Sequence, residues 1–278
     1  MIPKIIHYCW FGGNPLPELA QKCIASWKKH CPDYEIKEWN ESNFDLNCCD
    51  YVREAYAAKK WAFVSDYARF LILYHEGGIY FDTDVEVIRP IDEILEWGPF
   101  LGCEKKESVV PGFGMAANPG LGMAANPGLD IYKEILDFYE SRHFRKDDET
   151  IDTTTVVNYT SDILKLHGWK PDGTIQKIEE ITIYPPEYFC PMDFETGEIT
   201  IKPDTYTIHH YSASWFTAKE RKIVEIRRKF KRKYGEEKGD RLALLLCIPI
   251  RALNKLETKG LNGTLQSIKN KFRKENKG

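Results

Sequence analysis

The chain lacks the features of a secreted, disulfide-rich or membrane-spanning protein. Its start, MIPKIIHYCWFGG, has no charged leader, long apolar run or small-residue cleavage site, so we expect no secretory signal and a cytoplasmic location. The eight cysteines form no CxxC pair and have no regular spacing, which favours reduced, buried thiols over a disulfide framework or a zinc site. The apolar run LALLLCIPIRAL has 12 residues and contains Pro249, so it is too short to span a bilayer but long enough to lie on one.

The charge is divided unevenly along the chain. Its 278 residues, 42% hydrophobic and 29% charged, suffice for one large domain or for a domain with an appendage. Residues 221–278 contain 18 Lys and Arg against 6 Asp and Glu, which leaves a net charge of −15 for residues 1–220. We therefore expect a catalytic domain over 1–220 and a basic helical tail over 221–278. The mixture of basic and apolar residues in the tail favours an anionic membrane over nucleic acid.

Alternating strand and helix patterns predict an α/β fold. The main segments are a strand at 3–9, a helix at 19–30, a strand at 34–39, one long helix at 51–75 closed by Gly77-Gly78, and a strand at 79–87.

The octapeptide GMAANPGL occurs twice in succession, at 114–121 and 122–129. Eight residues are too few for a solenoid repeat. Asn-Pro-Gly is typical of turns, and a surface loop absorbs eight extra residues at small entropic cost. We expect one copy to be extruded as a loop, and the sequence does not decide which.

The stretch EGGIYFDTDVE at 76–86 alternates between apolar and polar residues. As a strand it would carry Tyr80, Asp82, Asp84 and Glu86 on one face, with neighbours about 6.5 Å apart. Carboxylates this close repel one another unless they face solvent or bind a cation. Oxygen ligands of this kind suit Mg²⁺ or Mn²⁺, which commonly bridge substrate phosphates.

Two other interpretations of the acidic stretch stay open. IYFDTDVEV fits in part the strand and DxDx[TV] signature of haloacid-dehalogenase-type phosphatases, in which Asp82 would be the nucleophile. That motif normally lies near the chain start and needs a downstream Lys and an acidic pair. A non-catalytic, cation-dependent carbohydrate-binding protein is the second alternative.

Three segments together resemble the DxD-containing glycosyltransferases of family 32, which include capsule and lipopolysaccharide sugar transferases and, more distantly, the glucosylating clostridial toxins. The segments are IPKIIHYCWFGG, SDYARFLILYHEGGIYFDTDVEV and HHYSASW. The resemblance covers residues 1 to about 216. It implies a GT-A type, Rossmann-like nucleotide-sugar-binding fold.

The resemblance also implies roles for individual residues. Asp84 would bind Mn²⁺ or Mg²⁺ directly, and Asp82 would bind sugar or ribose hydroxyls and the metal through water. Asp66 and Arg69, an i, i+3 pair on one helix face, match residues that contact the donor sugar, so we expect them and Asp82 to act in catalysis. Tyr80 would lie beside the donor.

Four further residues match the ends of this donor site. Trp10 would stack on the nucleobase. His210 would complete the metal shell, while Ser214 and Trp215 would lie near the diphosphate. His209 and His210 point to opposite sides of a strand, so at most one of them faces the metal.

The expected reaction is transfer of a hexose, with retention, from a nucleotide sugar to a saccharide or lipid-linked saccharide acceptor. A UDP-sugar is preferred to a GDP-sugar. The expected setting is surface polysaccharide biosynthesis, with peripheral contact to the inner face of the cell membrane and no nucleic acid partner.

Overall fold

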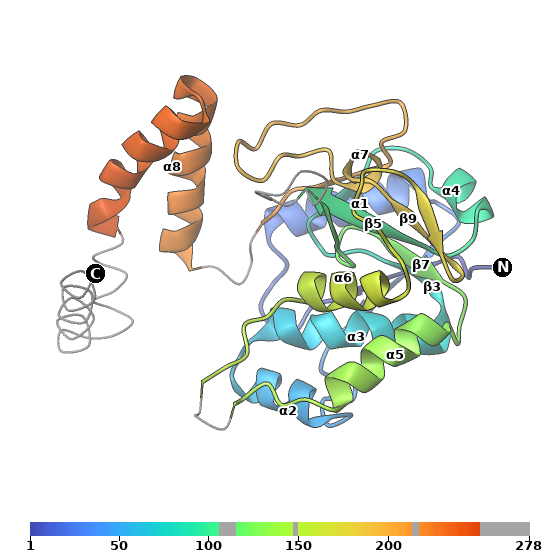
Figure 1. Ribbon diagram of the computed structural model, residues 1–278. Helices are drawn as coiled ribbons and strands as arrows, with labels where there is room; N and C mark the ends of the chain where they lie inside the picture. The colour runs from blue at the N-terminus through green and yellow to red at the C-terminus, as the bar shows by residue number, and fades with distance from the viewer. Residues whose placement is uncertain (106–114, 147–149, 213–216, 251–278) are drawn as a thin grey trace. The chain divides into compact units, whose positions relative to one another are not determined.

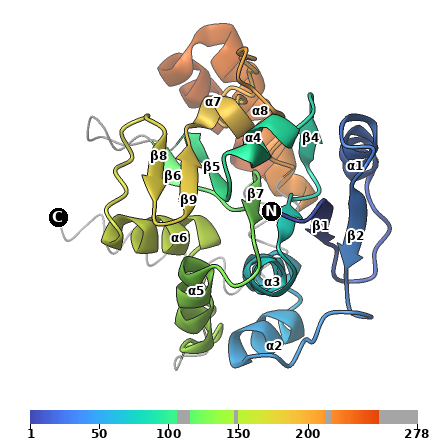
Figure 2. The same cartoon turned by 90° about the vertical axis from the view of Figure 1, so that its right-hand side faces the viewer.

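The computed structural model describes residues 1–105, 115–146, 150–212 and 217–250 (Figures 1 and 2). The chain divides into two compact units. The first comprises Met1–Asp193 and Glu198–Ser212, and the second comprises Phe194–Gly197 and Ala213–Gly278.

The first unit contains helices and short strands in alternation. In chain order they are β1 (Ile5–Cys9), α1 (Glu18–His30), β2 (Glu35–Trp39), α2 (Asp50–Ala57), α3 (Trp61–Glu76), β3 (Gly78–Tyr80), β4 (Val85–Val87), α4 (Asp92–Glu96), β5 (Phe100–Lys105), β6 (Met115–Ala117), β7 (Met123–Ala125), α5 (Asp130–Glu140), α6 (Val156–Leu166), β8 (Gln176–Ile178), β9 (Ile181–Tyr184), α7 (Pro186–Phe189) and β10 (Thr207–His209).

A mixed sheet forms the centre of this unit, with the strand order β2-β1-β3-β7-β5-β9-β8 and with β6 also paired to β5. Strands β2, β1 and β3 are parallel, whereas β7 is antiparallel to both β3 and β5. Strands β4 and β10 form a separate antiparallel pair. The expected α/β class is confirmed, and the arrangement is consistent with the GT-A type.

Helices cover both faces of the sheet. Helices α3, α5 and α6 lie on one side and α1, α4 and α7 on the other (Figures 1 and 2). Two hydrophobic clusters fill the layers: Tyr80 belongs to the cluster of α3, α5 and α6, and Ile79 and Phe81 belong to the cluster of α1 and α7. Alternate residues of one strand therefore contribute to opposite cores, as the pleat requires.

Two segments expected to be continuous are interrupted. The long helix at 51–75 is two helices, α2 and α3, separated at residues 58–60, where Lys59 has a φ of 56°. The strand at 79–87 is also wrong as a single element. It splits into β3 and β4, which belong to different sheets, and a turn closed by a bond from Val85 N to Asp82 O (3.1 Å) lies between them.

The expected extrusion of one copy of GMAANPGL is likewise wrong for the described residues. The first copy forms β6 and the buried turn that follows it, and the second forms β7 between β3 and β5. Residues 115–125 are all buried. Both copies are used because the apolar Met-Ala-Ala segment can pair with a strand at either position.

The end of α3 packs tightly against the sheet through Gly77 and Gly78, which have φ values of 65° and 93°. A Cβ at Gly78 would lie 2.7 Å from Ile5 O, so only glycine fits. His7 spans the same junction: its Nδ1 accepts from Trp39 Nε1 (3.1 Å), and its Nε2 contacts Gly77 O (3.0 Å) and therefore donates to it. Burial lowers the pKa of His7 to about 4.

The second unit contains α8 (Ala218–Tyr234) and a further helical segment at 236–250. A capping box starts α8: the Thr217 side chain accepts from Glu220 N, and the Glu220 side chain accepts from Thr217 N. The two helical segments approach closely at Gly239, where a Cβ would lie 2.6 Å from Lys231 Cα. Within the described ranges, no helix combines the length and the apolarity needed to cross a membrane.

Candidate active site

The site lies at one edge of the parallel strands. Strands β1 and β3 run parallel, so their carboxyl ends carry Trp10 and Asp82 out of the sheet at the same edge. This edge is the usual ligand-binding position of open α/β sheets. The interruption between β3 and β4 places Asp82, Thr83 and Asp84 in a turn there instead of inside a strand.

Asp82 is fixed by groups on three sides. Its backbone N donates to Gly120 O (2.9 Å), and its Oδ1 accepts from Tyr80 OH (3.1 Å). Arg69 Nη2 lies 3.2 Å from the same Oδ1. The Asp82 side chain nevertheless remains 31% exposed, so one carboxylate is both held in place and accessible to a ligand.

Arg69 and Asp66 form a buried pair on α3 rather than a surface ion pair. Arg69 Nη2 donates to Asp66 Oδ1 (3.0 Å), Arg69 Nε donates to Ser65 O (2.9 Å), and the guanidinium lies 4.9 Å from the centre of the Tyr80 ring. Burial raises the pKa of Asp66 to about 7, against the opposing effect of Arg69. The helix thus presents one cation to two carboxylates, those of Asp66 and Asp82.

Asp84 pairs with a histidine from β10. His209 Nε2 lies 3.2 Å from Asp84 Oδ1, and Ser212 N donates to Asp84 Oδ2 (2.7 Å). Burial by itself would raise the pKa of Asp84, but His209 and the Ser212 bonds outweigh it and hold that pKa well below its usual range. Burial would likewise lower the pKa of His209, but Asp84 raises it well above the ordinary value.

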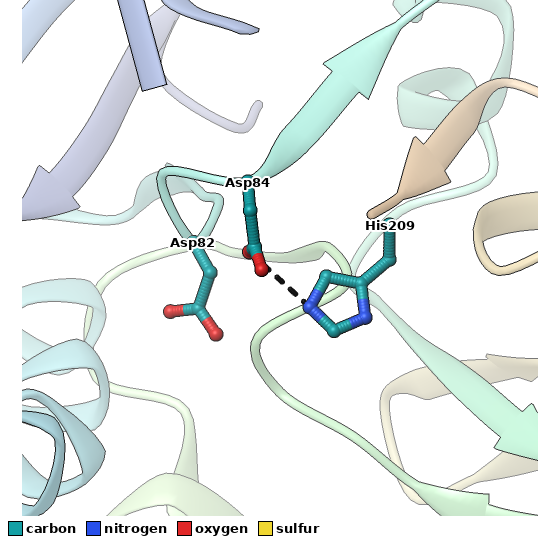
Figure 3. Close-up of side chains that lie close together, drawn as sticks. All are labelled: Asp82, Asp84 and His209. Carbon is teal, nitrogen blue, oxygen red and sulfur yellow. Dashed lines mark ion pairs between the residues drawn. The ribbon is translucent and has the colours of Figure 1, made fainter. Parts of the chain in front are cut away.

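Asp82, Asp84 and His209 fit a divalent cation. One ligand atom from each lies within 4.8 Å of the others, and Figure 3 shows both carboxylates directed toward the space in front of the imidazole. Two carboxylate oxygens with one imidazole nitrogen form a set that Mn²⁺ accepts readily and that Mg²⁺ also binds through its oxygens. His209 Nδ1 is buried and has no hydrogen-bond partner among the described residues, so the ring is held through Nε2 by Asp84 and by packing against the Tyr211 ring, whose centre lies 4.3 Å away.

The choice of His210 as the third metal ligand requires correction. The two histidines do point to opposite sides, as expected, but His209 faces Asp84, whereas His210 Nε2 lies 2.8 Å from Glu86 Oε2. The register of β10 against β4 decides this, because it pairs His209 with Val85 and leaves His210 N to donate to Asp84 O (3.0 Å).

The expected substrate-binding residues differ in their exposure, and two of them lie outside the described part of the chain. Trp10 is partly buried, and its Nε1 donates to Asn14 O (2.6 Å). Tyr80 is only 1% exposed, so it reaches the site through its bond to Asp82 rather than through its ring. Ser214 and Trp215 lie outside the described residues.

Residues from the first GMAANPGL copy complete the wall beside Asp82. A Cβ at Gly120 would overlap Asp82 Oδ2, and Asn118 Oδ1 accepts from Gly120 N (2.9 Å) to hold this turn. Sequence reasoning missed Gly120 and Asn118, although the repeated turn motif was visible. It also missed Glu104 and Tyr211, which contact each other across more than 100 residues of sequence.

A comparison with known families assigns this segment. Residues 17–100 match a family model described as "Glycosyltransferase sugar-binding region containing DXD motif". The match includes Asp66, Arg69, Asp82 and Asp84 but ends before β10. It supports the broad family of DXD-containing glycosyltransferases expected from the sequence.

Curated relatives agree with this match. The chain is 30% identical over 111 residues to inositol phosphoceramide mannosyltransferase 1 of Schizosaccharomyces pombe, which covers 36% of this chain and 33% of that protein. It is 36% identical over 104 residues to inositol phosphoceramide mannosyltransferase 3 of the same organism, a match that covers 34% of this chain and 28% of that protein. An uncharacterized glycosyltransferase of Acanthamoeba polyphaga mimivirus is 28% identical over 122 residues, a match that covers 41% of this chain and 47% of that protein. The chain spans less than half the length of each of these relatives.

Solved structures give weaker likenesses. PaToxG glycosyltransferase has a TM-score of 0.45 at 19% identity and covers 59% of this chain and 69% of that chain. A glycosyltransferase involved in glycosylation of the major capsid of PBCV-1 has a TM-score of 0.41 at 12% identity. The match covers 80% of this chain and 100% of that chain. Likenesses of this strength say nothing about substrate or mechanism.

Proposed function

We propose that this protein is a metal-dependent glycosyltransferase that moves a hexose from a nucleotide sugar to a glycan or lipid-linked glycan acceptor. The observation that carries the proposal is the group of Asp82, Asp84 and His209, whose ligand atoms lie within 4.8 Å of one another. The two aspartates lie inside the segment that matches DXD-containing sugar-binding regions.

The three proposed ligand residues would have different roles in binding the cation and the donor. Asp84 and His209 are buried and would hold the cation from within, whereas the more exposed Asp82 would contact both cation and donor. A Mn²⁺ or Mg²⁺ ion bound there supplies Lewis-acid stabilisation of the charge that develops on the leaving diphosphate. Arg69 would hold Asp82 in place, and Asp66, buried and paired with Arg69 at 3.0 Å, would act on a developing oxocarbenium ion through that pair rather than by direct contact.

The donor site extends from Asp82 toward Trp10. The shared sheet edge favours stacking of the nucleobase on Trp10, and Ser214 and Trp215 remain proposed contacts of the diphosphate. We propose a UDP-hexose as donor and retention of the anomeric configuration, in surface polysaccharide biosynthesis. The names of the Schizosaccharomyces relatives, inositol phosphoceramide mannosyltransferases, favour a lipid-linked acceptor and suggest a mannose donor for the test panel.

The test is release of nucleoside diphosphate from a panel of UDP- and GDP-sugars with Mn²⁺, Mg²⁺ or a chelator. The wild-type protein should release it slowly without acceptor, and Asp84→Asn should lose at least 100-fold of that turnover. Asp162→Asn, a change at a side chain that is 73% exposed on α6, should be unaffected. Metal-independent turnover, phosphate release from aryl phosphates, or sugar binding without turnover would each contradict the proposal.

We further propose that the division of the chain is functional, with catalysis in residues 1–220 and docking to an anionic membrane in residues 221–278. Within the described part, Leu245, Leu246 and Ile248 are 65%, 54% and 58% exposed on a segment that follows the basic helix α8. Exposed apolar side chains beside clustered Lys and Arg suit a lipid surface.

Vesicle sedimentation tests this second proposal. Leu245→Asp with Leu246→Asp should abolish binding of the full chain to phosphatidylserine vesicles and leave donor hydrolysis intact. Leu166→Asp, at a leucine that is 82% exposed on α6, is the matched control and should bind as the wild type does. Equal vesicle binding by the double variant and the control would refute membrane docking through this segment.

A further inference from the structure

Glu104 lies near the C-terminal end of β5 and contacts two segments that are distant from each other in sequence. Its Oε2 accepts from Asn118 Nδ2 (2.9 Å) and from Tyr211 OH (3.2 Å). Asn118 follows β6, and Tyr211 follows β10. One carboxylate oxygen therefore connects the loop of the first octapeptide copy to the segment that carries the histidines.

The first connection leads to Asp82. Asn118 Oδ1 accepts from Gly120 N (2.9 Å), and Gly120 O accepts from Asp82 N (2.9 Å). Because Asn118 is bonded at both its amide nitrogen and its oxygen, its side chain is fixed in one orientation. The Asn118 side chain thus helps to hold the Gly120 turn that contacts the backbone of Asp82, together with backbone bonds from Asn118 N to Gly102 O (3.0 Å) and from Leu121 N to Asn118 O (3.3 Å).

The second connection leads to Asp84. The Tyr211 ring centre lies 4.3 Å from that of His209, whose Nε2 contacts Asp84 Oδ1 at 3.2 Å. Tyr211 has a φ of 49°, a left-handed conformation that costs a non-glycine residue free energy unless its surroundings hold it. The bond from Tyr211 OH to Glu104, with Cys190 Sγ 3.0 Å from the same hydroxyl, supplies that constraint.

We infer that Glu104 is a positioning residue that sets the distance between Asp82 and the Asp84–His209 pair. It acts through Asn118 and Tyr211. Loss of its carboxylate removes the acceptor that both donors share, so the Gly120 turn and the Tyr211 ring beside His209 lose the link between them. The inference rests on the proposed function to the extent that the positioned groups bind a cation.

Titration calorimetry with Mn²⁺ and no nucleotide tests it. Glu104→Ala should weaken Mn²⁺ binding about 10-fold, as is typical for groups that orient metal ligands, and Glu104→Gln, which keeps one acceptor oxygen, should lose less. The matched control is Glu38→Ala on β2, because Glu38 likewise accepts from a tyrosine hydroxyl (Tyr8, 2.6 Å) and an asparagine amide (Asn40, 2.8 Å). The control should lose stability without losing Mn²⁺ affinity.

Conservative changes keep the test decisive if Glu104→Ala does not fold. Glu104→Gln and Tyr211→Phe share one hydrogen bond, so the double variant should lose less Mn²⁺ affinity than the sum of the single losses. Strictly additive losses, or affinities equal to the wild type, would overturn the inference.

A readout without metal separates this inference from the proposed function. In metal-free protein, the ring resonances of His209 should shift in Glu104→Gln and stay unchanged in Glu38→Gln. If the wild type binds no Mn²⁺, the metal proposal fails, and the His209 resonances alone then decide the role of Glu104. Unshifted His209 resonances would show that Glu104 does not position this ring.

Discussion

Gly120 leaves no room for a side chain beside the Asp82 carboxylate. A Cβ at this position would overlap Asp82 Oδ2 and would lie 3.0 Å from Arg69 Nη1. Because Oδ2 is the end of a side chain, Asp82 can rotate away, and Gly120→Ala should lower the free energy of unfolding by only about 1–2 kcal/mol. The rotated carboxylate would lose its contacts with Tyr80 at 3.1 Å and Arg69 at 3.2 Å.

The larger effect of Gly120→Ala is expected on metal binding. Asp82 is one of three ligand residues, so its rotation should weaken Mn²⁺ binding about 10-fold or more. Calorimetry measures this affinity, and urea unfolding measures the stability of the same preparation. A variant that loses stability and keeps its full Mn²⁺ affinity would refute the reasoning.

The second octapeptide copy provides a control glycine that has the same neighbours in sequence but different neighbours in space. Gly128 occupies the same place in Asn-Pro-Gly-Leu but has a φ of 80°, and a Cβ there would have no atom within 4 Å. Gly128→Ala should therefore cost about 1–2 kcal/mol through backbone strain alone. It should leave Mn²⁺ affinity unchanged, so the two variants would lose similar stability but differ in binding. Equal Mn²⁺ affinity in both variants would show that Gly120 does not constrain Asp82.

Three further outcomes are expected elsewhere. Burial lowers the pKa of His7 from 6.5 to about 4, so its stabilisation is complete above pH 6.5 and lost toward pH 4. Urea titrations should show a fall of about 3 kcal/mol over this range, absent in His7→Gln. Gly239→Leu should separate the helices of the second unit and expose Cys247, which is 0% exposed, to thiol labelling detected by mass spectrometry. Thr217→Ala removes the capping box with Glu220 and should speed hydrogen exchange in the first turn of α8, at a cost of about 1 kcal/mol.

Local patterns in the sequence were sufficient to single out several residues that the structure places close together. The spacing of Asp66 and Arg69 places them on one face of any helix, and the structure joins them at 3.0 Å. Asp82 and Asp84 were identifiable because closely spaced carboxylates on one face of an expected strand repel one another unless they face solvent or bind a cation. The α/β class followed from the alternation of segments with the hydrophobic period of a strand, two residues, and segments with that of a helix, about 3.6 residues. These features depend on separations of a few residues, which backbone geometry fixes.

The tertiary structure decided what depends on pairing between distant segments. The sequence HHYS contains no signal that selects His209 over His210, because the choice depends on the register of β10 against β4, more than 120 residues away. Glu104 carried no signal for the same reason, since its partners come from two later segments.

The octapeptide shows this limit most directly, because GMAANPGL occurs at both 114–121 and 122–129. The sequence alone determined that each copy can form an apolar strand followed by a turn. Only the three-dimensional fold made Gly120 a wall of the site and left Gly128 open, since identical residues in the two copies differ in the segments packed against them and in backbone conformation.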